Sequence, residues 1–180
     1  MLLAINTAHS IYSVAIENNG EVIEDADSAI KENTSKVLML KINQLIKKTN
    51  LKHQDIKTLL VNLGPGTFTG IRIAISTAIG FRLAMNTQLI GITSTQLLAF
   101  KLYDGLNPIE IKQDAKRGQI FHQKFDKNLK AISEITLKDA NEFDEIDFSA
   151  KDMISFYHKF QHLTTNNIEP VYVREDYTQK

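Results

Sequence analysis

Residues 63–85 read LGPGTFTGIRIAISTAIGFRLAM, and this stretch decides the fold. An apolar run at residues 58–63 predicts a strand, and the loop after it leads straight into a helix expected from about residue 69 to 85. A glycine-rich turn between a strand and a helix is a possible phosphate site, because free backbone N–H groups and the helix dipole both favour an anion. The loop consists of Gly64, Pro65, Gly66, Thr67, Phe68, Thr69 and Gly70.

The glycine loop does not match the patterns of nucleotide-binding loops. It lacks the GxxxxGKS/T spacing and any lysine that would reach a β- or γ-phosphate. In the pattern GxGxxG, counted from Gly64 and Gly66, the third glycine position holds Thr69, and Gly70 comes one residue too late. Local chemistry therefore favours tight strand-to-helix packing over nucleotide binding.

The helix after the loop carries two rows of small residues spaced four apart. One row is Gly70, Ala74 and Ala78, and the other is Ser76, Gly80 and Ala84. The remaining positions are mostly large and apolar, with Arg72 and Arg82 as the only charges, and a helix that is apolar almost all round is buried almost all round. Two interpretations stay open. This helix and the helix expected at residues 34–48 bury each other within one chain, or they meet a partner protein.

The residues around this stretch predict an α/β fold. Alternating or apolar runs indicate strands at residues 2–6, 11–17, 21–28, 58–63 and 88–92, and helices are expected at residues 34–48, 69–85 and 94–102. Asn18-Asn19-Gly20 is a strong hairpin signal, and Ser94 is the expected cap of the last of these helices. A β-meander followed by α-β-α-β-α predicts a mixed sheet flanked by helices.

The second half of the chain has a weaker pattern. Strands are expected at residues 108–113 and 119–125 around a turn at 114–118, with a third strand at 131–137 and an acidic loop at 138–149. Residues 152–160 fit either a strand or a helix, and residues 170–174 an extended segment. We expect residues 1–103 to form an N-terminal lobe and residues 104–180 a smaller C-terminal lobe.

Composition excludes several classes of function. The 180 residues carry 21 basic and 21 acidic side chains, so the bulk charge would not draw the chain onto RNA or an anionic membrane. The absence of cysteine excludes a disulfide framework, a thiol nucleophile and a cysteine-ligated zinc. With no signal peptide and no apolar run of about 20 residues, we expect a cytoplasmic protein. The sequon Asn33-Thr34-Ser35 then indicates a helix start.

At this point the sequence resembles a known family. GPGTFTGIRIAISTAIGFRLA (residues 64–84) closely resembles the GPGSFTGLRIG signature of the TsaB (YeaZ) family. Four further segments fall in the family's order: LLAINTAHSIYSVAI (2–16), NTSKVLMLKINQLI (33–46), DAKRGQIF (114–121) and EPVYVRE (169–175).

The resemblance implies an actin-like ATPase (ribonuclease H-like) fold in two lobes, with a reduced second lobe. It implies a non-catalytic subunit that helps to transfer a threonylcarbamoyl group to the adenosine beside the tRNA anticodon. The expected partners are the catalytic paralogue TsaD and the ATPase TsaE, which would hold the metal and ATP. This chain would then need no cofactor of its own, contact tRNA only indirectly, and form a homodimer when alone.

In this family the first two helices form the partner interface. The residues expected at that interface are Leu38, Ile42, Gly70, Ile71, Arg72, Ala74, Ile75, Ala78 and Ile79. We expect Ala78→Glu or Gly70→Leu to abolish pairing while leaving the fold mostly intact. Asp114 and Arg117 lie on the expected turn at 114–118, either as ordinary turn residues or, as the resemblance implies, with a role in the cleft between the lobes or in partner contact.

The alternative is an active enzyme, either an actin-fold ATPase or a metallopeptidase-like protein. Active actin-like ATPases carry a metal-holding aspartate where this chain has Asn6, a poorer ligand for a hard cation. His158 and His162 have the i,i+4 spacing of a helical metal pair, but no third ligand is evident. His9 follows the first strand, either lining a cleft or lying on a surface turn, and no Ser-His-Asp set is apparent.

Overall fold

A computed structural model describes residues 1–28, 34–140 and 142–173 of the chain. Its first sheet has the order β3-β2-β1-β4-β5. Three antiparallel strands form the predicted meander, and two parallel strands continue it. Their bounds are β1 (Leu2–Asn6), β2 (Ile11–Asn18), β3 (Glu21–Ser28), β4 (Thr58–Asn62) and β5 (Gln88–Ile92). The hairpin is confirmed, since Asn19 and Gly20 both have positive φ, 52° and 84°.

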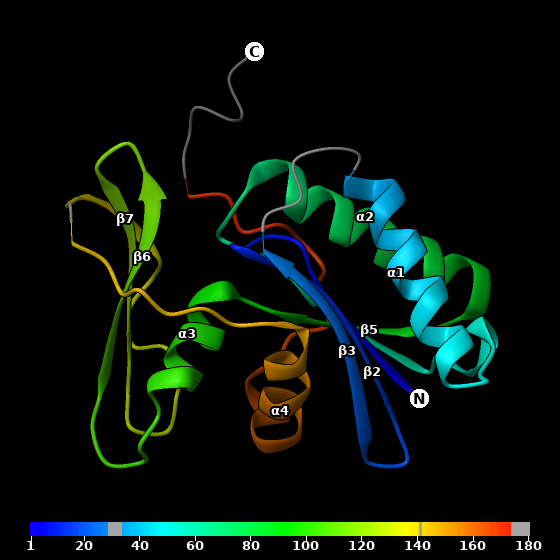
Figure 1. Ribbon diagram of the computed structural model, residues 1–180. Coiled ribbons are helices and arrows are strands. Elements are labelled where there is room, and N and C mark those ends of the chain that lie inside the picture. Colours follow the sequence, from blue (N-terminus) through cyan, green and yellow to red (C-terminus); the bar gives the residue numbers. More distant parts are fainter. Residues whose placement is uncertain (29–33, 141, 174–180) are drawn as a thin grey trace.

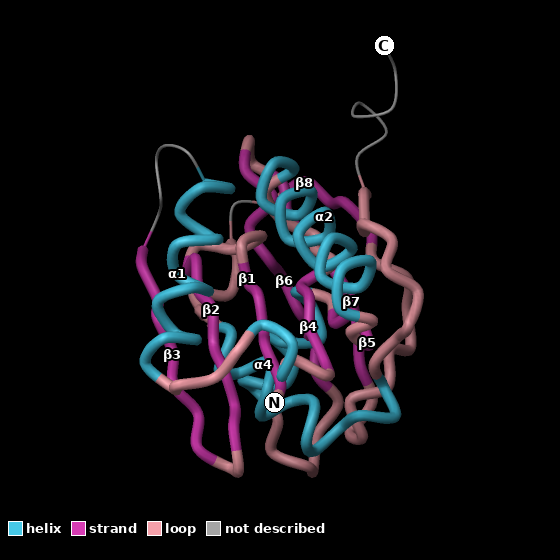
Figure 2. The backbone as a smooth tube through the Cα atoms, turned by 90° about the vertical axis from the view of Figure 1, so that its right-hand side faces the viewer, coloured by secondary structure: helices cyan, strands magenta, loops and turns pink. Residues whose placement is uncertain are grey.

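Helices cover both faces of this sheet (Figure 1). α1 (Thr34–Lys48) and α2 (Phe68–Met85) lie side by side on one face, which is turned toward the viewer in Figure 2. α3 (Ser94–Leu102) and α4 (Ala150–Phe160) lie on the other. Each face closes over its own hydrophobic cluster, so the mixed sheet flanked by helices is confirmed. The predicted helix start at Asn33 lies outside the described residues.

The second sheet has the order β6-β7-β8 and stands beyond α3 (Figure 1). Its strands are β6 (Ile109–Lys116), β7 (Gln119–Phe125) and β8 (Thr136–Asp139). β6 runs further than predicted, into the expected turn, and Lys116 and Arg117 carry the positive φ values that turn the chain. The third strand begins later than predicted, with Ala131 forming only an isolated bridge to Phe125.

α4 settles an ambiguity of the sequence and crosses the expected boundary between the lobes. Residues 150–160 form a helix whose buried side packs on β1, β2 and β3 of the first sheet. The amide of Ala150 donates to Ser13 Oγ at 2.7 Å, so the first residue of α4 is bonded to β2. A division at residue 103 stays a prediction, but residues from both sides of it build the core around the first sheet.

Two short 3₁₀ turns and one cap complete the fold. η1 (His53–Asp55) follows α1, and η2 (Gln161–Leu163) follows α4. The cap of α3 is Thr93 and not Ser94, because Thr93 Oγ1 accepts the Gln96 amide while the Gln96 side chain reaches back to the Thr93 amide. The last described residues form no strand, although the Val171 amide donates to Leu63 O at 2.8 Å.

Candidate functional site

The glycine loop is built to touch the turn after β1. Thr67 N–H donates to Ala8 O at 2.9 Å, and Thr7 Oγ1 donates to Gly70 O at 2.6 Å. A Cβ on Gly66 would stand 2.1 Å from Ala8 O, and one on Gly70 would stand 1.8 Å from Thr7 O. The glycines are therefore required by close backbone approach, which is the tight packing that the sequence favours over a phosphate site.

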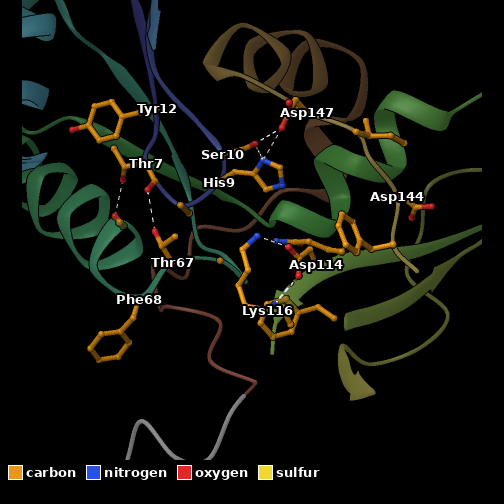
Figure 3. Close-up of a pocket in the computed structure, with 18 of the residues that line it drawn as sticks. Thr7, His9, Ser10, Tyr12, Thr67, Phe68, Asp114, Lys116, Asp144 and Asp147 are labelled. Atoms are coloured by element: carbon orange, nitrogen blue, oxygen red, sulfur yellow. Dashed lines mark hydrogen bonds and ion pairs between the residues drawn. The ribbon is translucent and has the colours of Figure 1, made fainter. Parts of the chain in front are cut away.

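This contact forms one wall of a cleft of about 990 Å³ (Figure 3). The turn at residues 7–10 and the loop at 66–70 line one side, and residues 113–117 of the β6–β7 hairpin line another. Residues 143–147, from the acidic loop before α4, complete it. Segments far apart in the sequence thus meet at one place, and both Asp114 and Arg117 lie there as predicted.

His9, Ser10 and Asp147 form a polar cluster at the mouth of the cleft (Figure 3). Ser10 Oγ donates to Asp147 and lies 2.8 Å from His9 Nδ1, while His9 Nδ1 is 3.6 Å from Asp147 Oδ1. Burial lowers the pKa of His9, although Asp147 acts to raise it. The Ser10 hydroxyl donates to the Asp147 carboxylate and not to the His9 ring. His9 is therefore not placed as the base that would activate Ser10 as a nucleophile.

Gln113 is a buried residue among those that line the cleft. It is 4% exposed, and its Nε2 donates to Pro65 O at 2.9 Å, which ties β6 to the glycine loop. Its Oε1 has no hydrogen-bond partner among the described residues. Sequence reasoning missed both Gln113 and Asp147, because neither lies in a motif and only the fold brings them to the loop.

The tip of the β6–β7 hairpin carries a local ion pair. Lys116 donates to Asp114 through its side chain, and through its amide at 2.7 Å. Burial raises the pKa of Asp114, but these two bonds outweigh that effect and lower the pKa below its usual value. Asp114 therefore stays ionised and holds the turn, which is the ordinary structural role of such a residue.

The residues at the end of β1 do not fit a metal ion. Asn6 is fully buried, and its Nδ2 donates to Ile11 O and Phe148 O while its Oδ1 accepts from Asn62 Nδ2 at 2.9 Å. Asn62 Oδ1 in turn accepts from Gly64 N and Ser94 Oγ. Both polar atoms of the Asn6 side chain thus already have hydrogen-bond partners within the chain. No group of three His, Cys, Asp or Glu side chains in residues 1–28, 34–140 and 142–173 is placed to hold a metal.

The two histidines with metal-like spacing lie on different helical segments. His158 is on α4 and pairs with Glu17 at 2.8 Å, whereas His162 lies on η2, after the α-helix has ended. The i,i+4 spacing therefore does not place the two rings one turn apart on one α-helix.

The residues predicted to meet a partner mostly face inward. Arg72 is exposed and Ile79 half-buried, but the other seven are buried within the chain: Leu38, Ile42, Gly70, Ile71, Ala74, Ile75 and Ala78. All seven pack within this chain. The expectation that Ala78→Glu or Gly70→Leu spares the fold does not hold, because both positions are packed inside it. An interface on these helices stays a prediction.

The outer side of α2 is made by the second row of small residues. Ser76, Gly80 and Ala84 are exposed, with Leu83 80% exposed beside them. By length and composition α2 could cross a membrane, but here its inner side packs on the sheet. At its N-terminal end Arg72 lies 3.7 Å from the centre of the Phe68 ring and donates to Tyr172 Oη at 3.0 Å.

Comparison with known proteins gives relatives over most of the chain. TsaB, the tRNA threonylcarbamoyladenosine biosynthesis protein of Escherichia coli K12, is 28% identical over 133 residues, which are 73% of this chain and 57% of that protein. TsaB of Bacillus subtilis 168 is 29% identical over 123 residues, 67% of this chain and 52% of that protein. The chain thus spans little more than half the length of these two relatives.

Solved structures share the fold. A Pseudomonas aeruginosa protein described as similar to the peptidase YeaZ has a TM-score of 0.78 at 18% identity, covering 96% of this chain and 99% of its own. YeaZ from the same organism has a TM-score of 0.75 at 17% identity, covering 95% and 98%. These likenesses and the sheet order confirm the predicted actin-like fold.

The sequence model of the TsaD family, described as tRNA N6-adenosine threonylcarbamoyltransferase, matches residues 21–163, which is well over half of the chain. Together with the glycine-loop signature and the TsaB relatives, this match makes the assignment. The chain belongs to the TsaD family, and within it the relatives that it resembles are TsaB (YeaZ) proteins.

Proposed function

We propose that this chain is a non-catalytic subunit in the formation of threonylcarbamoyladenosine on tRNA, and that it acts by docking on the catalytic paralogue TsaD. The names of its relatives support the pathway. The observation that carries the docking role is the outer side of α2. There a row of small residues and the 80% exposed Leu83 stand on a helix whose other side is fully used by the core. A surface of this kind is typical of a helix-packing interface.

The chemistry of the cleft supports an accessory role. Asn6 is committed to its buried network, the glycine loop is filled by the turn after β1, and Ser10 is bonded to a carboxylate. None of these groups is set up as a metal ligand, phosphate cradle or nucleophile. We therefore assign ATP and metal to TsaD and TsaE, and tRNA contact to the assembled complex. We also propose a cytoplasmic location for the chain. Homodimerisation through the same helices stays a prediction of the family resemblance.

Reconstitution tests the proposal. TsaD and TsaE from the same organism are incubated with tRNA, ATP and a threonylcarbamoyl donor, with and without this chain. We expect the chain to co-purify with TsaD and threonylcarbamoyladenosine to form only when it is present. Equal modification without it would overturn the proposal. Turnover of ATP by the chain alone would favour the rival interpretation, an active ATPase.

A further inference from the structure

The walls of the cleft carry more negative than positive charge. Four carboxylates and two basic groups line it, a net charge of −2 within a chain whose net charge is zero. The carboxylates are Asp114, Asp144, Glu145 and Asp147, and the basic groups are Lys116 and Arg117. Figure 3 shows Asp114, Asp144 and Asp147 around the same cleft. Lys116 is paired with Asp114, so the three carboxylates of the loop before α4 remain against one guanidinium, which is exposed on the β6–β7 turn.

Gln113 adds a buried hydrogen-bond acceptor that its own chain does not use. Its Nε2 donates to Pro65 O, which fixes the orientation of the amide, because the opposite orientation would set two carbonyl oxygens against each other. Its Oε1 then has no donor among the residues that the structure describes, and a buried acceptor in this state is unfavourable until a donor reaches it. Since Oε1 is itself covered, a ligand N–H reaches it when the side chains of the cleft shift slightly on binding.

His9 offers a second acceptor to the cleft. The Ser10 hydroxyl gives its proton to Asp147, so the short contact between His9 Nδ1 and Ser10 Oγ is made by an Nδ1–H donor. Burial lowers the pKa of His9, and a neutral ring that carries its proton on Nδ1 has an acceptor lone pair on Nε2. The ring is held against Phe148, with 4.4 Å between the ring centroids. The cleft therefore has hydrogen-bond acceptors to offer from two buried or half-buried side chains as well as from the carboxylates.

Apolar side chains line the same cleft. Phe121, Phe143 and Ile146 are among its lining residues, and Phe143 is 41% exposed. The loop before α4 reads FDEID at residues 143–147, so one short segment presents an aromatic ring and an aliphatic side chain next to three carboxylates. The face of an aromatic ring attracts a cation, and an alkyl stem packs on apolar surface while its charged end reaches polar groups. This combination fits a cationic group on an apolar stem.

Three other classes of ligand fit the cleft less well. A phosphate would be repelled by the net negative charge, and the glycine loop that could cradle it is filled by the turn after β1. A bare metal ion needs several close ligands, and within the described ranges 1–28, 34–140 and 142–173 no three His, Cys, Asp or Glu side chains are placed for one. A neutral polyol would leave the three loop carboxylates without a compensating charge.

We infer that this cleft binds an organic cation, namely an ammonium or guanidinium group on an apolar stem. The loop carboxylates balance its charge, Gln113 Oε1 and His9 Nε2 accept its N–H groups, and the apolar side chains of the cleft pack on its stem. Such a group belongs either to a free small molecule or to a lysine or arginine side chain of another protein, and the chemistry of recognition is the same. The inference is independent of docking on TsaD, since it uses no residue of α1 or α2.

Isothermal titration calorimetry with the full chain tests the inference. The probes are agmatine, which carries an ammonium and a guanidinium group on an apolar stem, a capped tripeptide with a central arginine, and AMP as an anionic comparison. The cleft variant carries Asp144→Asn, Glu145→Gln and Asp147→Asn, which keep the shape of each side chain. The matched control carries Glu21→Gln, Glu134→Gln and Glu169→Gln, all exposed and outside the cleft. Both variants lose three carboxylates, so the overall charge of the chain cannot explain a difference between them.

We expect agmatine to bind the wild-type chain with a Kd below about 1 mM, and this Kd to rise at least about 10-fold in the cleft variant and less than about threefold in the control. Added salt should weaken binding, because it screens the attraction between the cation and the carboxylates. No saturable binding of either cationic probe up to about 10 mM, equal affinities of the two variants, or tighter binding of AMP than of agmatine would overturn the inference.

Two single variants keep the test decisive if the triple variant unfolds. Glu145→Gln changes an exposed side chain and should raise the Kd for agmatine roughly threefold. His9→Phe keeps a ring against Phe148 but removes Nε2, and it should raise the Kd roughly 3- to 10-fold. An unchanged Kd in both would contradict the inference. Tighter binding of the tripeptide than of agmatine assigns the cleft to a protein side chain, the reverse order assigns it to a free small molecule, and either order supports an organic-cation site.

Discussion

Gly70 is the residue at which the glycine loop and the first turn approach most closely. The space for its Cβ is occupied by Thr7 O, and that carbonyl also lies within 3.4 Å of Thr67 Oγ1. Thr7 directly follows β1 and is buried, and Gly70 lies on α2, so neither side can move away without disturbing a packed element.

We predict that Gly70→Ala lowers the free energy of unfolding by more than about 2 kcal/mol, because the new methyl group meets backbone and not a flexible side chain. Gly80→Ala is the matched control on the same helix, and it should raise the free energy of unfolding by about 0.5–1 kcal/mol. Urea titration followed by circular dichroism measures both. If Gly70→Ala left the free energy of unfolding unchanged, the glycine loop would not be in close contact with the turn after β1.

His9 is the second residue with a measurable signature. Burial lowers its folded pKa below the usual 6.5, so between these two values the unfolded chain binds more protons than the folded chain. The free energy of unfolding then falls as the pH drops below about 6.5, and this contribution is fully present above it.

Variants around His9 should move this pH dependence in known directions. Asp147 raises the pKa of His9 and Lys116 lowers it. Asp147→Asn is therefore expected to deepen the loss of stability between pH 6.5 and 5, Lys116→Met to reduce it, and His9→Gln to remove the His9 part of it. Urea midpoints measured from pH 5 to 8 give the comparison. If the free energy of unfolding changed with pH equally in Asp147→Asn and Lys116→Met, the opposite effects of these two charges on His9 would be contradicted.

At the scale of the element, α1 is held to the edge strand β3 by a buried charge. Lys41 is 6% exposed, with its Nζ bonded to Asp25 and 2.8 Å from Asp27 Oδ2. The aspartates are partly exposed, so they can be hydrated when the lysine is removed, but the lysine cannot be hydrated when they are removed.

We expect an asymmetry between the two halves of this cluster. Lys41→Met should change the free energy of unfolding by less than about 1 kcal/mol, because an apolar side chain of similar length fills the same space. Asp25→Asn combined with Asp27→Asn should lower it by about 1–3 kcal/mol, because a buried ammonium loses its partners. Equal effects of the two changes, measured by urea denaturation, would mean that water reaches Lys41.

α2 shows how one element serves two surfaces. Its two rows of small residues look alike in the sequence, yet one row packs on the sheet and the other faces outward. Periodicity cannot distinguish them, because a helix that is apolar all round has no polar face to mark the outside. The inner row lets the helix approach the backbone, and the outer row leaves a shallow strip beside Leu83.

On the scale of the whole molecule, the chain leaves the first sheet after α3, builds the second sheet, and returns through α4. The returning helix buries Ala150, Met153, Ile154 and Phe156, and its first amide bonds to β2. The first sheet therefore has no complete second face without residues that lie far beyond position 103.

We predict that a fragment of residues 1–103 does not fold cooperatively, because the side of the sheet that carries Leu2, Ala4 and Leu60 would be open to water. Thermal unfolding and amide exchange should show a broad, weakly protected state. Adding residues 104–180 as a second polypeptide should restore a single sharp transition, and a cooperative transition in the fragment alone would show that α4 is dispensable.

The sequence by itself determined the order and type of most elements. Local signals carry that information: Asn18-Asn19-Gly20 for the hairpin, alternation for β2 and the glycine loop before α2. The weakly patterned region from residue 126 to 160 was predicted less well, because the ends of β8 and the helical state of α4 depend on which surfaces they meet.

Only the tertiary structure decided which side of each helix is buried and which residues share the cleft. Gln113 and Asp147 reach the glycine loop because two sheets and a returning helix meet there, and seven of the nine predicted interface residues proved to be core. The physical reason is that burial is a property of surfaces brought together over long sequence distances, and spacing along one helix cannot record which of two similar faces meets the sheet.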